Sequence, residues 1–217
     1  TDNTGATETW NGTSWTETAD LNTVRRNMTG NVGTTTSTII AGGKASPTLL
    51  AVSESWNGTS WTETSDLNDA RETIFLSGAD NTAALGAGGE TPGFTGNTEL
   101  WNGSSWAEQS NLSTARGNAG MTGTSVNALA FGGYTGSATA VMEEWNALTP
   151  IGAWSTGVSL NTARYNMTSG GDTTSEAAIF FGGNTSGSPP LTGVTESFNG
   201  SAWTEVADLN TARNGFM

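Results

Sequence analysis

One short stretch occurs five times in this chain, and this repetition limits the possible folds more than any other feature of the sequence. The copy at residues 99–108 reads Glu-Leu-Trp-Asn-Gly-Ser-Ser-Trp-Ala-Glu. The other copies occupy residues 8–17, 54–63 and 196–205, with a looser copy at 143–154. Their first aromatic residues lie 46, 45, 44 and 53 residues apart, at Trp10, Trp56, Trp101, Trp145 and Phe198. Such a period is typical of arrays that repeat one supersecondary unit.

Each copy has the composition of a β-hairpin. Asn-Gly suits a two-residue turn because both positions tolerate a positive φ, and the flanking Thr, Ser and Trp residues alternate as half-buried strands do. A Trp side chain buries about 150–250 Å², worth at most about 4–6 kcal/mol of transfer free energy. We therefore expect these aromatic residues in the core, and a row of sugar-stacking Trp residues is the alternative. The ten positions are Trp10, Trp15, Trp56, Trp61, Trp101, Trp106, Trp145, Trp154, Phe198 and Trp203.

Two further markers follow each hairpin. A polar loop with one Leu closes on an Arg and leads into small residues, as in Asn118–Gly123. A short apolar segment ending in Gly-Gly comes next, as in Ala128–Gly133, and paired Gly residues permit a bulge or a close backbone approach where a strand ends. Each unit thus predicts four strands: the first after Arg, the second up to Gly-Gly, the third at Glu-x-Trp, and the fourth at the second Trp.

This order of markers resembles the kelch repeat, and the resemblance covers essentially the whole chain. Kelch repeats form the four-stranded blades of a β-propeller. The chain departs from the pattern because Trp or Phe stands where Tyr usually follows the Glu, and because Asn-Gly replaces a longer turn. The Trp-Asn-Gly-[Ser/Thr]-Ser-Trp variety is similar to arrays in structural proteins of marine bacteriophages and in marine bacteria, which implies a virion-associated or extracellular location.

The resemblance implies one all-β domain over residues 1–217, a kelch-like β-propeller of five blades with four antiparallel strands each. The terminal blade would combine residues 1–22 with 213–217 and is expected to be incomplete, since no segment supplies its second strand. A chain continuing past Met217, or a strand from a neighbour, would complete it. The alternative is an open arc of a larger ring. The four complete blades are expected at about 25–68, 71–113, 116–161 and 164–210.

One Arg and one Glu recur in every unit. A repeated Arg with a repeated Glu most simply forms a structural ion pair that ties strands or blades together, and a ring of Arg residues facing a ligand is the alternative. If such a pair is desolvated, removal of one partner leaves a buried charge unpaired. The Arg set is Arg25, Arg71, Arg116, Arg164 and Arg213, and the Glu set is Glu8, Glu54, Glu99, Glu143 and Glu196.

Composition excludes several classes of function. The net charge of −13, with only seven basic residues, argues against nucleic-acid binding, which needs a basic face. No apolar run is long enough to span a bilayer, so we expect no membrane insertion. His and Cys are both absent, and we expect neither a metal site nor a cofactor. The acidic residues recur in columns rather than as a lone pair, so we do not expect an enzyme.

The loops between the second and third strands vary in length and sequence, whereas the strands repeat. Variable loops on a rigid scaffold commonly carry binding, so we expect a recognition module for a glycan or a protein on a cell surface. The alternative is a structural spacer or assembly domain of a virion or surface appendage, whose partners would be neighbouring chains. The expected contact residues are Lys44, Phe94, Tyr134 and Asn184.

Overall fold

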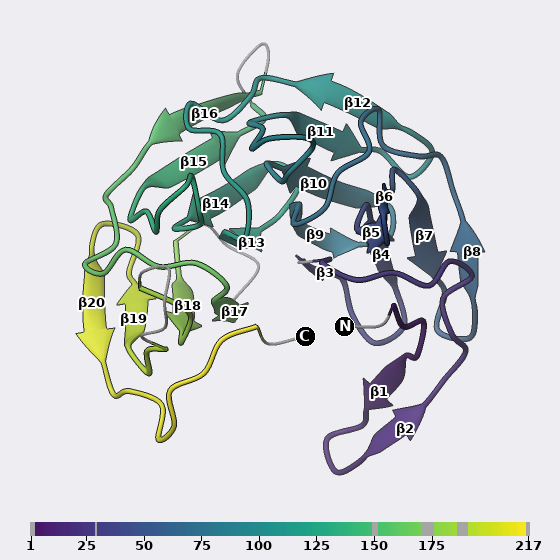
Figure 1. Cartoon of the computed structure of the whole chain (residues 1–217), viewed down its shortest axis with the longest axis horizontal. Coiled ribbons are helices and arrows are strands. Elements are labelled where there is room, and N and C mark those ends of the chain that lie inside the picture. The colour runs from purple at the N-terminus through teal and green to yellow at the C-terminus, as the bar shows by residue number, and fades with distance from the viewer. Residues whose placement is uncertain (1–2, 29, 149–151, 171–175, 186–190, 216–217) are drawn as a thin grey trace.

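The structure is a computed structural model that describes residues 3–28, 30–148, 152–170, 176–185 and 191–215. These residues form strands and no helix, so the chain is all-β. The strands make six sheets, none of which closes into a barrel. The sheets stand around a common centre, with β3, β9, β13 and β17 innermost and β8, β12, β16 and β20 at the periphery (Figure 1). This arrangement is propeller-like.

The second, third and fourth units each contain the four strands that the sequence predicts. Each sheet is antiparallel throughout its own unit, and the strands follow one another in chain order from the centre outward. The second unit holds β9 (Phe75–Asp80), β10 (Ala83–Ala87), β11 (Thr98–Trp101) and β12 (Trp106–Gln109). The third holds β13 (Gly120–Gly123), β14 (Asn127–Phe131), β15 (Met142–Asn146) and β16 (Ala153–Thr156). The fourth holds β17 (Thr168–Gly170), β18 (Ala178–Phe181), β19 (Thr195–Phe198) and β20 (Trp203–Val206).

The first unit differs from the predicted four-stranded antiparallel sheet. Its first strand, β3 (Asn31–Val32), pairs in parallel with β9 of the second unit. Gly33 N donates to Gly78 O (3.0 Å) in the same contact, and Val32 packs on the core between the two units. The remaining strands of the unit are β4 (Thr38–Ala41), β7 (Ser53–Trp56) and β8 (Trp61–Glu63), and its loop contains β5 (Lys44–Ala45) and β6 (Thr48–Leu49).

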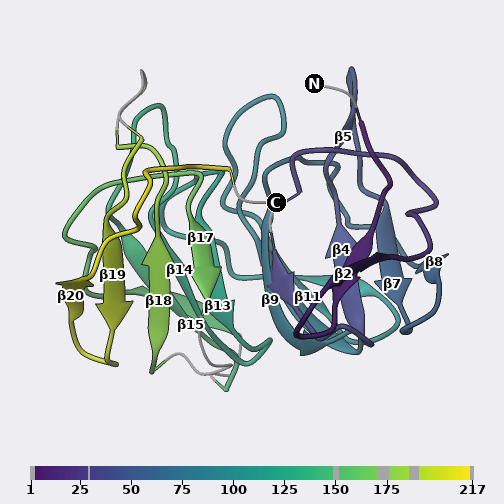
Figure 2. The same cartoon turned by 90° about the horizontal axis from the view of Figure 1, so that it is seen from below.

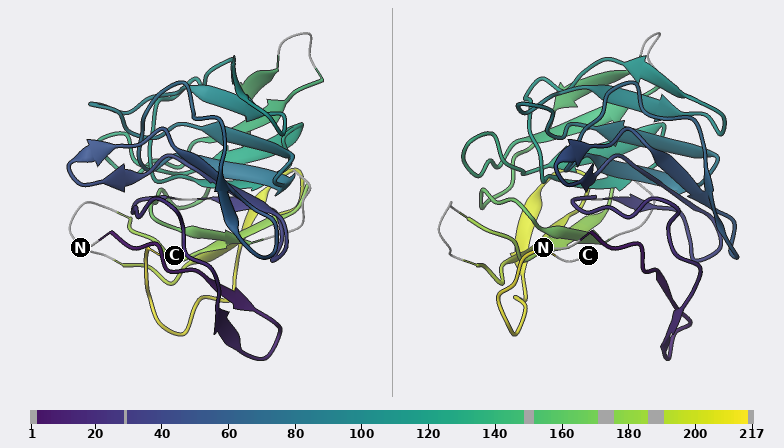
Figure 3. Two further views of the ribbon diagram at one scale, coloured as in Figure 1. Left: turned by 90° about the vertical axis from the view of Figure 1, so that its right-hand side faces the viewer. Right: turned by 45° about the vertical axis from the view of Figure 1, so that its right-hand side comes forward.

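The N-terminal copy of the repeat forms a separate hairpin of β1 (Glu8–Trp10) and β2 (Trp15–Glu17), here called the terminal hairpin. Figure 3 shows it standing apart from the other sheets. Its turn is built like those of the other units: Asn11 Oδ1 accepts from the N–H groups of Thr13 and Ser14 (2.9 Å each), and Gly12 has φ = 93°. Only the Gly carries the positive φ that the sequence led us to expect at both positions, because the Asn side chain caps the turn instead.

Adjacent units are also joined by backbone hydrogen bonds near the centre. The residue two positions after each Arg has a positive φ, between 52° and 61°, and its N–H donates to the equivalent residue of the preceding unit at 2.8–3.4 Å. Asn and Gly adopt this conformation readily, whereas Thr73 is unusual in it. The chain of bonds runs through Asn27, Thr73, Asn118, Asn166 and Gly215.

The core lies between neighbouring sheets. Three clusters of buried side chains fill the three interfaces from the first unit to the fourth. Trp101 and Trp145, 2% exposed, belong to these clusters, as the sequence predicts. Trp10 and Trp15 of the terminal hairpin are instead 43% and 64% exposed, so the prediction of a buried core position is wrong for this copy. The reason is that no neighbouring sheet packs against these rings, whereas Ile39 and Ala41 of the preceding unit cover the equivalent Trp101 and Trp106.

Candidate functional site

The loops between second and third strands lie at one end of the molecule, the upper end in Figure 2, on the same side as β5. A recurring backbone contact builds this end. In each unit the residue after Arg forms an isolated β-bridge with the residue after Gly-Gly, which fixes the start of the loop beside the first strand. The bridges are Arg26–Lys44, Glu72–Glu90, Gly117–Tyr134 and Tyr165–Asn184.

Three aromatic side chains from successive units meet at this end and are here called the rim aromatic cluster: Phe94, Tyr134 and Tyr165. The ring centroids of Phe94 and Tyr134 lie 5.6 Å apart at 73°, and those of Tyr134 and Tyr165 lie 4.9 Å apart at 52°. All three rings are half-buried. Gly117 lies against the Phe94 ring, and a Cβ there would come within 2.6 Å of Thr73 Oγ1. The cluster therefore offers aromatic surface to solvent on a base that the bridges hold in place.

The other two predicted contact residues lie at the same end but in different surroundings. Lys44 forms an ion pair with Glu72, with Nζ 2.7 Å from Oε1, and Glu72 also accepts from Asn27 Nδ2 at 2.5 Å. Asn184 is only 8% exposed and is bridged to Tyr165 of the cluster. The structure thus brings Phe94 and Tyr134 into contact and sets Asn184 beside them, while Lys44 belongs to an acidic neighbourhood in the first and second units.

The repeated Arg and Glu residues form buried ion pairs in four units. Arg116 and Glu143 are both fully buried, with Nη2 3.3 Å from Oε1, and burial lowers the pKa of Arg116 to about 10 against the opposing effect of Glu143. Each Glu also accepts from the backbone of the polar loop before the Arg, as Glu143 does from Ser113 N (2.7 Å). These side chains face the protein interior rather than a ligand. The pairs are Arg25–Glu54, Arg71–Glu99, Arg116–Glu143 and Arg164–Glu196.

The fifth members of the two sets are placed differently. Arg213 and Glu8 are both exposed, and the ion pairs found among the described residues do not include one between them. In a complete unit the Arg precedes the first strand and the Glu lies on the third, so the first and second strands lie between them in the sequence and bring them together. The terminal hairpin and the segment at Arg213 have no such strands between them.

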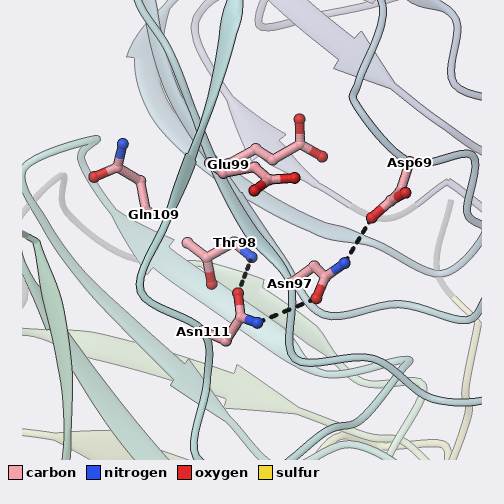
Figure 4. A pocket seen from close by; sticks show the side chains of 7 residues that line it. Asp69, Asn97, Thr98, Glu99, Gln109 and Asn111 are labelled. Atoms are coloured by element: carbon pink, nitrogen blue, oxygen red, sulfur yellow. Dashed lines mark hydrogen bonds between the residues drawn. The ribbon is translucent and has the colours of Figure 1, made fainter.

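A polar pocket of about 170 Å³ opens in the second unit, where the repeat is broken (Figure 4). Asp69 stands where other units have Thr, and Asn97 stands where other complete units have Val. Asn97 Nδ2 donates to Asp69 Oδ2 (2.6 Å), and Asn111 Nδ2 donates to Asn97 Oδ1 (3.2 Å). Over the described ranges, no group of three or more acidic residues is arranged to hold a metal ion. The internal hydrogen bonds make this pocket a polar packing defect rather than a ligand site.

Sequence reasoning missed Tyr165 and Glu72. Both occupy the position directly after the repeated Arg, which the sequence analysis did not single out. In every complete unit this position forms a bridge with the residue after Gly-Gly. Both positions lie at fixed distances from repeat markers, so a comparison of the units at these positions could have identified Tyr165 and Glu72. None of the described segments forms a helix that could cross a membrane.

The comparisons with known proteins bear on the fold. No protein-family model matches the sequence, and no curated protein sequence matches it. Among solved structures, that of YjhT superposes with a TM-score of 0.75 at 13% sequence identity, covering 93% of this chain and 76% of YjhT. At this identity the similarity shows the fold alone. The chain therefore shares its all-β, propeller-like architecture with YjhT.

Proposed function

We propose that this chain is a non-enzymatic recognition module, built as a kelch-like β-propeller of five blades, that binds a carbohydrate on a cell surface through the rim aromatic cluster. An extracellular or virion-associated location is part of this proposal. It is supported by the resemblance of the repeat and by the contact of three half-exposed aromatic rings, two of them on the variable loops, at one end of the molecule.

A contact at the C-terminal end supports the count of five. Gly183 N donates to Arg213 O (2.8 Å), just as Gly133 N donates to Arg164 O (2.9 Å) one unit earlier. Arg213 therefore stands where a following unit would begin. The terminal hairpin, at the other end of the series, supplies the third and fourth strands of such a unit.

The rim aromatic cluster is the single observation that carries the function. The C–H groups on one face of a sugar ring pack well against an aromatic ring, whose face is electron-rich. Exposed aromatic residues that gather in one place mark binding surfaces more often than scattered ones do. The Tyr hydroxyls supply hydrogen-bonding groups for sugar hydroxyls, and Glu90, whose backbone is bridged to Phe94, lies in the same loop. The bridges at Tyr134 and Tyr165 hold the backbone below the rings, so binding needs little ordering of the protein.

The test is a glycan array probed with the intact chain, followed by titration of the best glycan. Tyr134→Ala is expected to weaken binding at least tenfold, because the central ring of the cluster is lost. Thr135→Ala, an exposed neighbour in the same loop, is the matched control and is expected to bind like the wild type. Binding to bacterial cells is measured in parallel. Silence on the array, or cell binding that survives periodate oxidation of surface sugars, would exclude a carbohydrate ligand.

The second candidate is an assembly domain of a virion or surface appendage. The observation in its favour is the exposure of Trp10 and Trp15, which leaves two large apolar side chains uncovered on the terminal hairpin. Such surfaces mark protein–protein contacts. Sedimentation that finds a stable oligomer at micromolar concentration would favour this function over carbohydrate recognition.

A further inference from the structure

One edge of β1 is not occupied by any strand of the described residues. β1 pairs with β2 alone, whereas the equivalent strand β11 lies between β10 and β12. Thr18 N donates to Thr7 O (2.9 Å) on the β2 side. Backbone groups alternate between the two edges of an antiparallel strand, so the N–H and C=O groups of Glu8 and Trp10 face the other edge. This edge can therefore form backbone hydrogen bonds with a further strand.

A cavity of about 400 Å³ lies between the terminal hairpin and the first unit. Trp10 and Trp15 line one side of it, and Trp56 and Trp61 line the other.

The next interface shows what occupies the same space in a complete unit. There, Ile39 and Ala41 of the second strand β4 pack against Trp101 and Trp106, and all four side chains are buried. Trp106 Nε1 donates to Ser53 Oγ of the adjoining unit (2.9 Å). The cavity beside the terminal hairpin therefore lies where a second strand would place its two apolar side chains.

The face of the fourth unit that lies across the opening from the terminal hairpin is also apolar. Ile179 in the second strand of the fourth unit is 37% exposed, whereas its equivalents Ile39 and Leu85 are 1% and 0% exposed. Figure 1 shows the opening between the fourth unit and the terminal hairpin, with both chain ends close to it. Two apolar faces thus border one opening, and each is buried wherever a neighbouring unit is complete.

We propose that the free edge of β1 binds an extended segment of a second polypeptide, which adds to the sheet as an antiparallel strand. The segment has the pattern of this protein's own second strands: an apolar residue, any residue, a second apolar residue, then Gly-Gly. Its backbone would pair with Glu8 and Trp10, and its apolar side chains would fill the cavity. Strand addition of this kind gains affinity from main-chain bonds and specificity from alternate side chains.

The register of the bound strand follows from the repeat. Ile39 of β4 stands opposite Ser55, and Ile40 stands opposite Glu54. Ser55 corresponds to Thr9 in the terminal hairpin, so the first apolar residue of the segment is expected opposite Thr9. The two Gly residues then follow beyond Glu8, where other units need a positive φ, as at Gly42 (72°).

The binding test uses a labelled peptide with the sequence of residues 37–45, Ser-Thr-Ile-Ile-Ala-Gly-Gly-Lys-Ala, and the intact chain. We expect saturable binding by fluorescence anisotropy that weakens at least tenfold when Asp replaces the first Ile of the peptide. Trp10→Ala in the protein is expected to weaken binding similarly, because one wall of the cavity is lost. Thr13→Ala, in the exposed turn of the same hairpin, is the control and should bind normally.

The register test uses disulfide formation, which is clean because the chain has no cysteine. Thr9→Cys protein is mixed with peptides that carry one Cys at the position of Thr38, Ile39 or Ile40. The Ile39 position is expected to cross-link fastest, since directly opposite residues have the Cα separation that a disulfide needs. Equal cross-linking at all three positions, or equal binding of the Asp-substituted peptide, would overturn the proposal.

Another outcome would identify a different occupant. If two copies of the chain pair through their β1 edges, sedimentation will show a dimer that excess peptide does not dissociate, and the proposal is then wrong. The inference rests on the five-unit architecture proposed above and not on carbohydrate binding. If the peptide binds and no glycan on the array does, the strand-addition proposal stands and carbohydrate recognition fails. If a glycan binds and the peptide does not, the strand-addition proposal is wrong.

Discussion

The hairpin β11–β12 and the terminal hairpin have nearly the same sequence and the same turn, yet their surroundings differ. Trp101 and Trp106 are 2% and 6% exposed, whereas Trp10 and Trp15 are 43% and 64% exposed. Within each hairpin the two indole rings keep the same relation, with centroids 5.4 Å and 5.5 Å apart and planes tilted by 43°. The motif itself therefore determines the local structure of the hairpin.

The difference shows where the stability of this protein arises. The Asn-Gly turn and the paired Trp residues form in both places, but only a neighbouring sheet removes the rings from water. Hydrophobic burial is then a property of the interface between units, as in other repeat architectures. A copy at the end of the series keeps its hairpin structure but contributes less to the stability of the protein. Three pairs of substitutions and one single substitution test this comparison.

The largest contrast is expected from the first Trp of each hairpin. Trp101→Ala should lower the free energy of unfolding by about 4–5 kcal/mol, because it leaves a large cavity between two units. Trp10→Ala should lower it by less than about 1 kcal/mol, because that ring is already half-exposed. Urea denaturation followed by circular dichroism measures both. Equal losses would mean that the terminal hairpin is as much part of the core as β11.

The ion pairs give the second contrast. Arg116→Ala should cost about 3 kcal/mol, because Glu143 would remain as a buried charge without its partner. Arg213→Ala should change stability by no more than about 0.5 kcal/mol, since this side chain is exposed. The melting temperature of each variant provides the measurement. An unchanged melting temperature for Arg116→Ala would refute a structural role for the repeated pair.

The indole hydrogen bonds give a smaller contrast. Trp154 Nε1 donates to Thr98 Oγ1 (3.0 Å), so Thr98→Val should cost about 1 kcal/mol by removing the acceptor. Thr7 occupies the equivalent position in the terminal hairpin, and its hydroxyl makes the same local bond as that of Thr98, to Gly5 O and Gly96 O respectively (3.3 Å each), but the indole N–H of Trp61 does not donate to it. Thr7→Val should therefore be nearly neutral. Denaturant midpoints of the two variants decide the point, and a larger loss for Thr7→Val would contradict it.

The smallest effect is expected from a local side-chain contact in the turn between β9 and β10. Asp80 accepts from the hydroxyl and the N–H of Thr82, and these bonds lower the pKa of Asp80 below its ordinary 3.8. Because the folded pKa is depressed, the stabilisation is present above about pH 4 and is lost as the pH falls through the folded value. Asp80→Asn should cost less than about 0.5 kcal/mol at pH 7, since solvent screens this exposed group. Melting curves should show the difference disappear as the pH falls through the folded pKa of Asp80.

Much of the fold could be predicted from the sequence because each strand carries a local marker. Gly-Gly ends the second strand, as at Gly132 and Gly133, and the paired Trp residues define the third and fourth. The pairing of β3 with β9 could not be predicted, because two residues without a distinctive pattern find their partner by proximity at the centre. The exposure of Trp10 could not be predicted from its own motif either, since burial depends on what stands beside it.

The candidate site was predictable in part for the same reason. Phe94 and Tyr134 were found because they lie in loops that interrupt a strict repeat. Tyr165 was missed because it lies inside the repeat, at a position where other units have Arg26, Glu72 and Gly117. Its contact with Tyr134 arises from the arrangement of successive units, which no single copy of the motif encodes. A position that varies within a conserved frame deserves the same scrutiny as a variable loop.

The backbone bonds around the centre have a direction. At every joint the later unit gives the N–H and the earlier unit gives the carbonyl, from Thr73 to Asn27 through to Gly215 and Asn166. The two faces of a unit are consequently not interchangeable, and a contact between unlike faces is heterologous. Further units can join this series only head to tail. Each added unit is therefore rotated in the same direction as the one before, and addition stops when the ring closes.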